Sequence, residues 1–299
     1  MKILLTAAAG NQGKVLLPKL SALGHTVRAA RVSAGRDDEL LALGASEVFV
    51  GDLSDVETYT AALEGCDAVY HVGPAGIASE KKYGLAMIEA ARRNGTPHVV
   101  MSSVYHTIID IVQHRWKRDI EEKLFESGLN CTVLRPCDFM IVEHYLDIPL
   151  RTGALPMFWK LKPGRRGSMI AIDDLTDVAA KVLTEGSRHY FANYELAGSE
   201  KLTPHEIARI LARILGKPIG VEEQTPEEFM RKNFGLTEIT GIWQEYLEVI
   251  ESISAWYSEH EFIGNPNVLE WFLGRPPTTF EAFARKTLPL RQALLTGQP

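Results

Sequence analysis

The fold of this chain is decided by its first segment, Lys2-Ile3-Leu4-Leu5-Thr6-Ala7-Ala8-Ala9-Gly10-Asn11-Gln12-Gly13. A short apolar run leads into a turn of small residues, and the residues after the turn can open a helix. Small residues let a backbone approach a ligand closely, and a helix start presents free N–H groups and a positive dipole end to an anion. The segment therefore predicts a strand, a tight turn and a helix, with phosphate as the expected ligand of the turn.

The glycine spacing is close to that of a dinucleotide-binding turn, which has Gly-x-x-Gly-x-x-Gly or a near variant. Gly10 and Gly13 keep the pattern, whereas Ala7 replaces the first glycine. Because alanine tolerates positive φ poorly, we predict a negative φ at Ala7. The alternative is an ordinary strand-to-helix turn, but the position after the first strand and the pattern that follows favour a dinucleotide site.

Composition and charge narrow the class of protein. The chain has 299 residues, 45% of them hydrophobic, and a net charge of −6. Without a basic block, nucleic acid is not an expected partner, and without a long apolar run neither is a membrane. The three cysteines, Cys66, Cys131 and Cys137, are spaced for neither a metal site nor a disulfide framework. We expect a cytoplasmic protein with no metal.

Strand-like and helix-like segments alternate up to residue 136, which is typical of a parallel sheet with right-handed crossovers. Strands are predicted at residues 25–31, 47–50, 67–72, 97–103 and 131–136, after the opening strand. A helix is predicted from Lys82 to Arg93, and Ile109 to Leu124 carry the apolar face of a long helix. The predicted fold class is α/β, a Rossmann-type doubly wound parallel sheet with a smaller, mainly helical C-terminal substrate region. The expected domains are residues 1–150, with the sheet completed by a segment around 168–196, and residues 151–299.

Two helix starts in the second half are well marked. Thr203-Pro204-His205-Glu206 and Thr225-Pro226-Glu227-Glu228 both fit a capping box with proline at the first helical position. A further helix carries an apolar stripe that we assign mainly to the core: Trp243, Tyr246, Ile250, Ile253 and Tyr257.

The end of the second strand indicates which dinucleotide binds. A fold that binds NAD has an acidic residue there to hold the ribose 2′-hydroxyl, whereas this chain has Arg31. A guanidinium can grip a 2′-phosphate, so NADP(H) is the expected cofactor. The alternative is that Arg31 is a solvated surface arginine. Asp52, after the third strand, is placed to accept from the adenine amino group, and Gly73-Pro74 can pass beneath the cofactor.

Several segments together resemble the NmrA-like branch of the atypical short-chain dehydrogenases. They are Thr6 to Gly13, Val27 to Arg31, Gly51 to Leu53, Lys117 to Leu129, Leu134 to Pro136, Ile172 to Ala180 and Leu273 to Phe280. The resemblance covers nearly the whole chain and implies an NADP-binding Rossmann domain with a small substrate domain. Its relatives include isoflavone reductase-like enzymes, triphenylmethane reductase, quinone reductases and redox sensors without turnover. The residues expected at the cofactor are Thr6, Ala7, Gly10, Asn11, Gln12, Gly13, Arg31, Asp52, Leu53, Val72, Gly73, Pro74, Ser102, Lys117, Pro136 and Cys137.

The chain lacks the proton donor of common short-chain dehydrogenases, which is the tyrosine of a Tyr-x-x-x-Lys pair. Lys117 fits the lysine place by the resemblance, but Gln113 stands four residues before it, and an amide cannot exchange a proton at neutral pH. Lys117 could bind ribose hydroxyls or, if desolvated, act as an acid or base; its alternative is a surface lysine. Tyr105 and then His106 are the other candidates for catalysis. Asp138, Phe139 and Met140 are expected to line the substrate pocket, although the last two could equally be core.

Two functions fit these residues. The first is an NADPH-dependent reductase that transfers hydride to an apolar, aromatic or conjugated small molecule such as a quinone, enone or imine. Such acceptors delocalise charge or take a proton from water, so they need no strong acid. The alternative is a non-catalytic NADP(H)-binding redox sensor. We rank isomerisation or dehalogenation lowest. The expected partner is a small-molecule substrate, with a homodimer as a candidate assembly.

Overall fold

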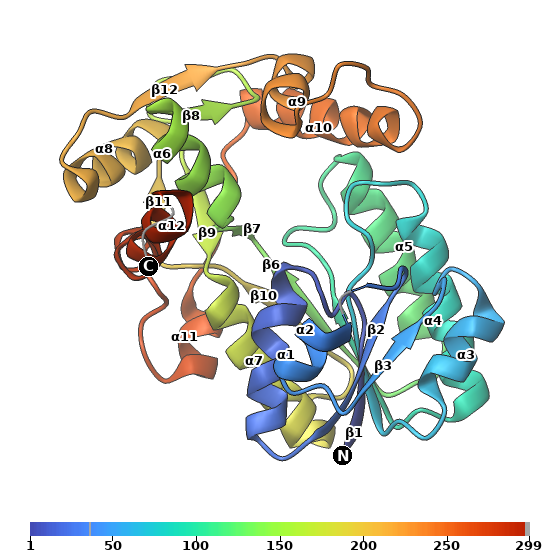
Figure 1. Ribbon diagram of the computed structural model, residues 1–299. Coiled ribbons are helices and arrows are strands. Elements are labelled where there is room, and N and C mark those ends of the chain that lie inside the picture. Colours follow the sequence, from blue (N-terminus) through green and yellow to red (C-terminus); the bar gives the residue numbers. More distant parts are fainter. Residues whose placement is uncertain (36, 297–299) are drawn as a thin grey trace. The chain divides into compact units, whose positions relative to one another are not determined.

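A computed structural model of the protein describes residues 1–35 and 37–296 (Figure 1). The chain folds into two compact units. Unit 1 contains Met1–Ile109, Gln113–Pro136 and Ile172–Leu196, and unit 2 contains Asp110–Val112, Cys137–Ala171 and the chain from Ala197 onwards. Residues 137–150, which the sequence placed with the first domain, thus belong to unit 2, because strand β7 (Asp138–Phe139) pairs with β9 (Gly167–Ile170) of that unit.

Unit 1 is built on a seven-stranded sheet in the order β10-β6-β5-β4-β1-β2-β3. Every neighbouring pair is parallel, and the order reverses beside β1, which confirms the predicted doubly wound α/β fold. The late strand β10 adds to the edge of β6, inside the segment predicted to complete the sheet. The strands are β1 (Lys2–Leu5), β2 (Thr26–Arg31), β3 (Glu47–Val50), β4 (Ala68–His71), β5 (His98–Ser102), β6 (Cys131–Pro136) and β10 (Ala192–Leu196).

Helices cover both faces of this sheet, as Figure 1 shows, with α1 packed against α7 and α3 packed against α4. The helix predicted from Ile109 begins only at Val112, and α4 begins two residues before its predicted start at Lys82. The helices are α1 (Asn11–Ala22), α2 (Asp37–Ala42), α3 (Val56–Leu63), α4 (Glu80–Asn94), α5 (Val112–Glu126), α7 (Ile172–Glu185) and the 3₁₀ turn η2 (Gly186–His189).

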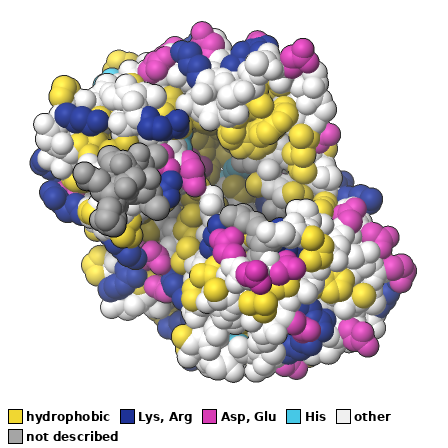
Figure 2. Space-filling view, viewed as in Figure 1, with side chains coloured by type: hydrophobic (Ala, Val, Ile, Leu, Met, Phe, Trp, Pro, Cys, Tyr) yellow, Lys and Arg dark blue, Asp and Glu magenta, His cyan; other side chains and the backbone are white. Residues whose placement is uncertain are grey.

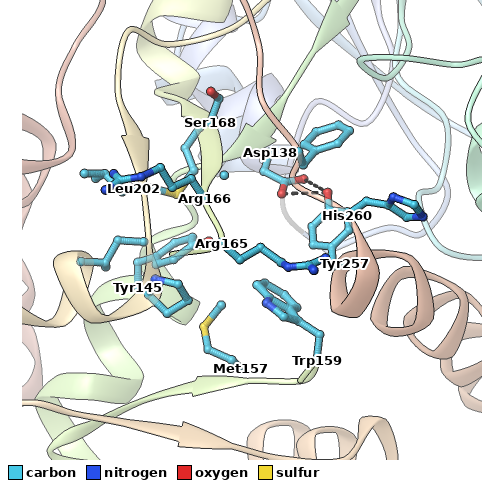
Figure 3. A pocket seen from close by; sticks show the side chains of 15 residues that line it. Asp138, Tyr145, Met157, Trp159, Arg165, Arg166, Ser168, Leu202, Tyr257 and His260 are labelled. Carbon is cyan, nitrogen blue, oxygen red and sulfur yellow. Dashed lines mark hydrogen bonds between the residues drawn. The ribbon is translucent and has the colours of Figure 1, made fainter. Parts of the chain in front are cut away.

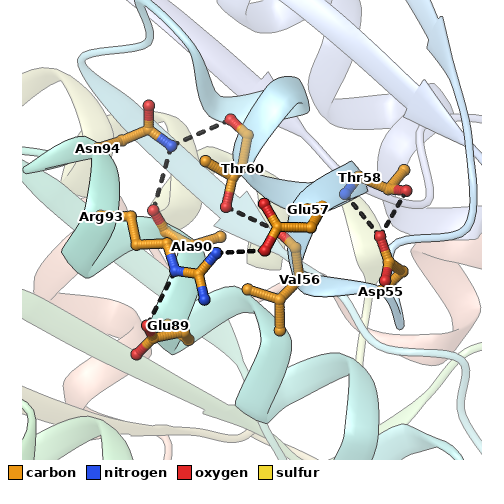
Figure 4. A network of polar contacts seen from close by, with 9 residues as sticks. All are labelled: Asp55, Val56, Glu57, Thr58, Thr60, Glu89, Ala90, Arg93 and Asn94. Atoms are coloured by element: carbon orange, nitrogen blue, oxygen red, sulfur yellow. Dashed lines mark hydrogen bonds and ion pairs between the residues drawn. The ribbon is translucent and has the colours of Figure 1, made fainter.

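A polar network joins α3 to α4 at the surface of unit 1 (Figure 4). The Asp55 carboxylate caps α3 by accepting from the Thr58 N–H at 2.8 Å. Arg93 Nη1 of α4 lies 2.6 Å from the Glu57 carboxylate of α3, and Asn94 donates to the Thr60 carbonyl at 3.0 Å. These contacts hold the pair of helices over an apolar core that includes Tyr59, Met87 and Ile120.

Unit 2 has smaller sheets than unit 1, and much of it is helical. It has a three-stranded sheet in the order β11-β9-β7 and a parallel pair of β8 with β12. Its strands other than β7 and β9 are β8 (Ala154–Met157), β11 (Lys201–Leu202) and β12 (Gly220–Glu223). Its helices are the π-helical η1 (Glu143–Asp147), α6 (Ile148–Thr152), α8 (Pro204–Leu215), α9 (Pro226–Phe234), α10 (Ile242–Glu259), α11 (Asn267–Leu273) and α12 (Phe280–Thr296).

Both predicted capping boxes of unit 2 are confirmed. Thr203 and Thr225 each accept from the backbone N–H three residues on, and the glutamates there reach back to the cap. The stripe on α10 is only partly core: Ile250 and Tyr257 are buried, whereas Trp243 is 37% exposed and meets the exposed ring of Phe234. Figure 2 shows hydrophobic side chains gathered over α9 and α10.

Among residues 1–35 and 37–296, no helix has the length and apolar character needed to cross a lipid bilayer.

Candidate functional site

The turn between β1 and α1 is tight and open toward the helix start. Gly10 N donates to the Ala7 carbonyl at 2.8 Å, which closes the turn. Ala7 has φ +47°, so its predicted negative φ is wrong. The closed turn requires the left-handed region that glycine usually provides, at a cost of about 1–2 kcal/mol for alanine. Ala7 is exposed, so this cost arises within its own backbone and not from packing against the core.

Gly13 is the residue that allows α1 to start so close to the turn. A Cβ atom there would lie 2.4 Å from the Ala8 carbonyl oxygen and 2.5 Å from that of Ala7. No side chain caps the first turn of α1, whose N-cap is Gly10. The helix thus begins directly beside the backbone of the turn, and no side chain occupies its first N–H groups. Free N–H groups at a helix start are the arrangement that binds phosphate.

Thr6 and Gln12 hold the turn from inside. Thr6 Oγ1 lies 2.7 Å from the N–H of Val72 and so ties the end of β1 to the end of β4. The Gln12 amide oxygen accepts from the buried Tyr70 hydroxyl at 2.7 Å. Of the predicted cofactor residues, these two side chains therefore serve to shape the turn, while Asn11 is exposed at its outer side.

Arg31 lies at the carboxyl end of β2, the strand next to β1, and is not a solvated surface arginine. The residue is only 9% exposed. Its Nη1 is 3.4 Å from the Asp37 carboxylate, a long contact, and its buried Nε has no hydrogen-bond partner among the described residues. A buried guanidinium nitrogen without an acceptor is costly unless a ligand supplies one. The position and the unpaired Nε fit an anion.

The residues predicted at the neighbouring strand ends share the same edge of the sheet. Asp52 is exposed and accepts from the Ser54 N–H and hydroxyl, which lower the pKa of its carboxyl group. Leu53 is buried behind it. Gly73 and Pro74 follow β4, and a Cβ atom at Gly73 would lie 3.1 Å from the side chain of Glu80.

Lys117 is buried on α5, so the surface-lysine interpretation is wrong. It is 8% exposed and donates to the Ser102 carbonyl at the end of β5, at 3.0 Å. Its Nζ also lies 2.6 Å from Oε1 of Glu80, whose side chain is fully buried. Lys117 and Ser102, each predicted at the cofactor, are thereby brought together, beside a carboxylate that the sequence did not single out.

Glu80 is the functional candidate that sequence reasoning missed. It stands in the run Ser79-Glu80-Lys81-Lys82, which reads as a solvated helix start, and the predicted helix began after it. Both of its carboxylate oxygens are buried without a hydrogen-bond partner among the described residues, although Oε1 lies 2.6 Å from the Lys117 ammonium group. No spacing in the sequence relates Glu80 to Lys117, because the contact between α4 and α5 depends on how the helices pack on the sheet.

Tyr105 and His106 follow β5, as predicted, but neither is a free acid. Tyr105 is buried, with its ring centroid 4.1 Å from that of His106. His106 has φ +52°, and its Nδ1 lies 3.5 Å from the Glu195 carboxylate of β10. Its carbonyl group is within hydrogen-bond distance of the buried His114, at 3.0 Å. The catalytic roles of Tyr105 and His106 stay predictions.

Pro136 ends β6, whereas Cys137, Asp138, Phe139 and Met140 lie in unit 2. Burial raises the pKa of the Cys137 thiol, which disfavours the thiolate. Asp138 lines a pocket of unit 2, shown in Figure 3, and accepts from the Tyr257 hydroxyl at 2.9 and 3.0 Å. Phe139 and Met140 are not among the residues lining this pocket, and Met140 packs in the core of unit 2.

Comparison with known proteins gives a consistent result. The sequence model of the NmrA-like family matches residues 1–284. The NAD(P)H azoreductase of Xenophilus azovorans is 26% identical over 285 residues, which cover 95% of this chain and 96% of that protein.

Two solved structures share the fold. The triphenylmethane reductase of Citrobacter sp., complexed with NADP(H), has a TM-score of 0.78 and 20% identity, and the match covers 96% of this chain and 100% of that one. The negative transcriptional regulator NmrA, in complex with NADP, has a TM-score of 0.76 and 18% identity, with 98% and 97% covered. Since the family match spans nearly the whole chain, this protein belongs to the NmrA-like family.

Proposed function

We propose that this protein is an NADP(H)-dependent oxidoreductase that reduces a conjugated or aromatic small molecule without a Tyr-x-x-x-Lys pair. The observation that carries the proposal is the buried Arg31 guanidinium, with its unpaired Nε, at the strand end beside the open start of α1. The azoreductase likeness along 95% of the chain and the cofactors in the names of the similar structures support the same assignment.

The residues present fit the coenzyme. The first N–H groups of α1 suit the pyrophosphate, and Gly13 lets the helix that presents them start close against the turn. Arg31 suits the 2′-phosphate, provided that Asp37, at 3.4 Å, gives way to the stronger acceptor. NADPH, when bound, supplies a hydride from its nicotinamide ring.

Lys117 has donors left for the coenzyme. An ammonium group has three N–H donors, and the Ser102 carbonyl accepts from one of them, while Glu80 supplies the counter-charge at 2.6 Å. We assign a remaining donor to a ribose hydroxyl, which positions the nicotinamide. In this arrangement Lys117 is a binding residue rather than the acid of the reaction.

The acceptor must then be one that needs no strong acid from the protein. Gln113 cannot exchange a proton, and it stands where a Tyr-x-x-x-Lys pair has its tyrosine. Quinones, enones, imines and azo compounds delocalise the incoming charge, and water can supply the proton. This chemistry supports a conjugated acceptor rather than a simple alcohol or ketone.

A turnover assay tests the proposal. Purified protein is mixed with NADPH and a panel of quinones, enones, imines and azo dyes, and the loss of NADPH absorbance is followed. We expect turnover with at least one conjugated class and none with simple ketones. Reduction of simple ketones at comparable rates would contradict the assignment.

The second candidate is a redox sensor that binds NADP(H) without turnover. The glutamine at position 113 and the likeness to the regulator NmrA favour it. A sensor requires different affinities or conformations with the two coenzyme forms. No turnover across the panel, combined with unequal affinity for NADP and NADPH, would select it.

A further inference from the structure

One carboxylate lies at the proposed 2′-phosphate site, beside the buried Arg31. Asp37 is the first residue of α2, and its Oδ1 lies 3.4 Å from Nη1 of Arg31. Among the described residues, no other carboxylate forms an ion pair with this guanidinium group. The Asp37 side chain is 48% exposed, whereas that of Arg31 is 8% exposed. The pair therefore joins a desolvated cation to an anion that solvent can reach.

The contact between Asp37 and Arg31 is too loose to satisfy the guanidinium group. A hydrogen bond from a guanidinium group to a carboxylate is usually about 2.7–2.9 Å long, so a separation of 3.4 Å is a weak contact. The Nε atom of Arg31 is buried and has no hydrogen-bond partner among the described residues. Asp37 thus supplies part of the counter-charge and leaves donors for a stronger acceptor such as phosphate.

The backbone that carries Asp37 is anchored on both sides of α2. Lys14 of α1 lies 2.8 Å from the Glu39 carboxylate, which ties the first turn of α2 to α1. Leu40 of α2 is fully buried. Since an ion pair of this exposure is weak, the Asp37 side chain can rotate into water at little cost. The anchored backbone nevertheless keeps its carboxylate close to any anion that binds Arg31.

We propose that Asp37 limits the preference of this protein for NADPH over NADH. A 2′-phosphate on Arg31 must displace the Asp37 carboxylate and then has it as a neighbouring like charge, which lowers the affinity for NADPH. NADH has a ribose 2′-hydroxyl in place of this phosphate, and a carboxylate can accept its proton. Asp37 therefore disfavours one coenzyme and not the other. The inference rests on the proposed function and deepens it by naming the residue that sets the coenzyme preference.

Calorimetric titration of NADPH and NADH into the full-length protein and its variants tests the inference. We expect Asp37→Asn to raise the affinity for NADPH about 5-fold, which corresponds to a surface charge interaction of about 1 kcal/mol. The affinity for NADH should stay unchanged or fall. Asp38→Asn is the matched control, because Asp38 is exposed, carries the same charge and makes no ion pair with Arg31. It should change neither affinity by more than about 2-fold, since solvent screens exposed charges.

An unchanged or lower affinity of Asp37→Asn for NADPH would overturn the inference. An equal gain for NADH, or an equal gain in Asp38→Asn, would also overturn it, because either result indicates a general effect of net charge. Asp37→Ala, which removes the carboxylate without adding an amide, should show the same gain, and thermal unfolding checks that each variant is folded. If neither coenzyme binds the unmodified protein, the proposed function fails as well, whereas normal binding with an unchanged preference rejects only the role of Asp37.

Discussion

Replacing Glu80 by glutamine should destabilise unit 1 strongly, because it leaves the Lys117 ammonium group buried without its counter-charge. The Glu80 side chain is fully buried, and its Oε1 lies 2.6 Å from Nζ of Lys117. At that separation the gross attraction is about 6 kcal/mol for an effective dielectric constant of about 20. Desolvation of both groups offsets much of it, but loss of one partner from a buried pair still costs about 3–5 kcal/mol.

We expect Glu80→Gln to lower the free energy of unfolding by about 3 kcal/mol, near the lower end of that range, since the neutral amide keeps a polar oxygen beside the Lys117 ammonium group. Amide hydrogen exchange in β4 and β5 gives the free energy of unfolding for unit 1 without mixing in unit 2. Lys117→Met and the double variant complete a thermodynamic cycle. The double variant should lose less free energy of unfolding than the two single variants lose together, because methionine in place of Lys117 leaves no buried charge that needs a counter-charge.

A loss below about 1 kcal/mol for Glu80→Gln, or strictly additive effects in the cycle, would refute this reasoning, since either result means that the pair is effectively solvated. Lys81→Gln is a suitable control, because Lys81 pairs with Asp119 at the exposed surface. That substitution should change the free energy of unfolding by less than about 1 kcal/mol.

Three further outcomes are expected. Arg31→Ala should weaken NADPH binding about 10- to 100-fold and NADH binding hardly at all, as measured by calorimetry, and equal losses would rule out the phosphate contact. Gly13→Ala should abolish NADPH binding and lower the melting temperature, because its Cβ would lie 2.4 Å from the Ala8 carbonyl oxygen; unchanged binding would show that the turn can relax. Burial holds the pKa of Asp138 at about 6, above its usual value, so its ionisation costs stability as pH rises through 6. The free energy of unfolding of Asp138→Asn, measured with urea, should therefore rise by about 1 kcal/mol relative to that of the unmodified protein when the pH is raised from 5 to 8. A difference between the two proteins that does not change with pH would contradict this.

The sequence predicted the sheet of unit 1 well because the signals there are local. Apolar runs ended by Gly, Pro and Asp placed β3 and β6 at their observed bounds, and Arg31 was located as the last residue of its strand. The capping boxes at Thr203 and Thr225 are equally local, since each consists of four consecutive residues.

What the sequence could not predict depends on contacts between distant segments. Glu80 and Lys117 meet only after α4 and α5 pack on the sheet, and a charged residue in a charged run gives no sign of burial. The positive φ of Ala7 follows from closure of the turn rather than from alanine's own preference. Arg165 and Arg166 are adjacent and of the same type in the sequence, and only the folded positions of Lys201 and Glu206 give Arg166 partners while Nη1 of Arg165 has none among the described residues.

Calorimetric titration of NADPH and NADH into the purified protein tests most directly whether a phosphorylated nicotinamide coenzyme binds at residues 6–13 with Arg31 on its extra phosphate. We predict heat of binding with both coenzymes and an affinity at least about 10-fold higher for NADPH, the ratio expected for one charge-assisted contact. No heat with either coenzyme at millimolar concentration would contradict the assignment, and with it both proposed functions.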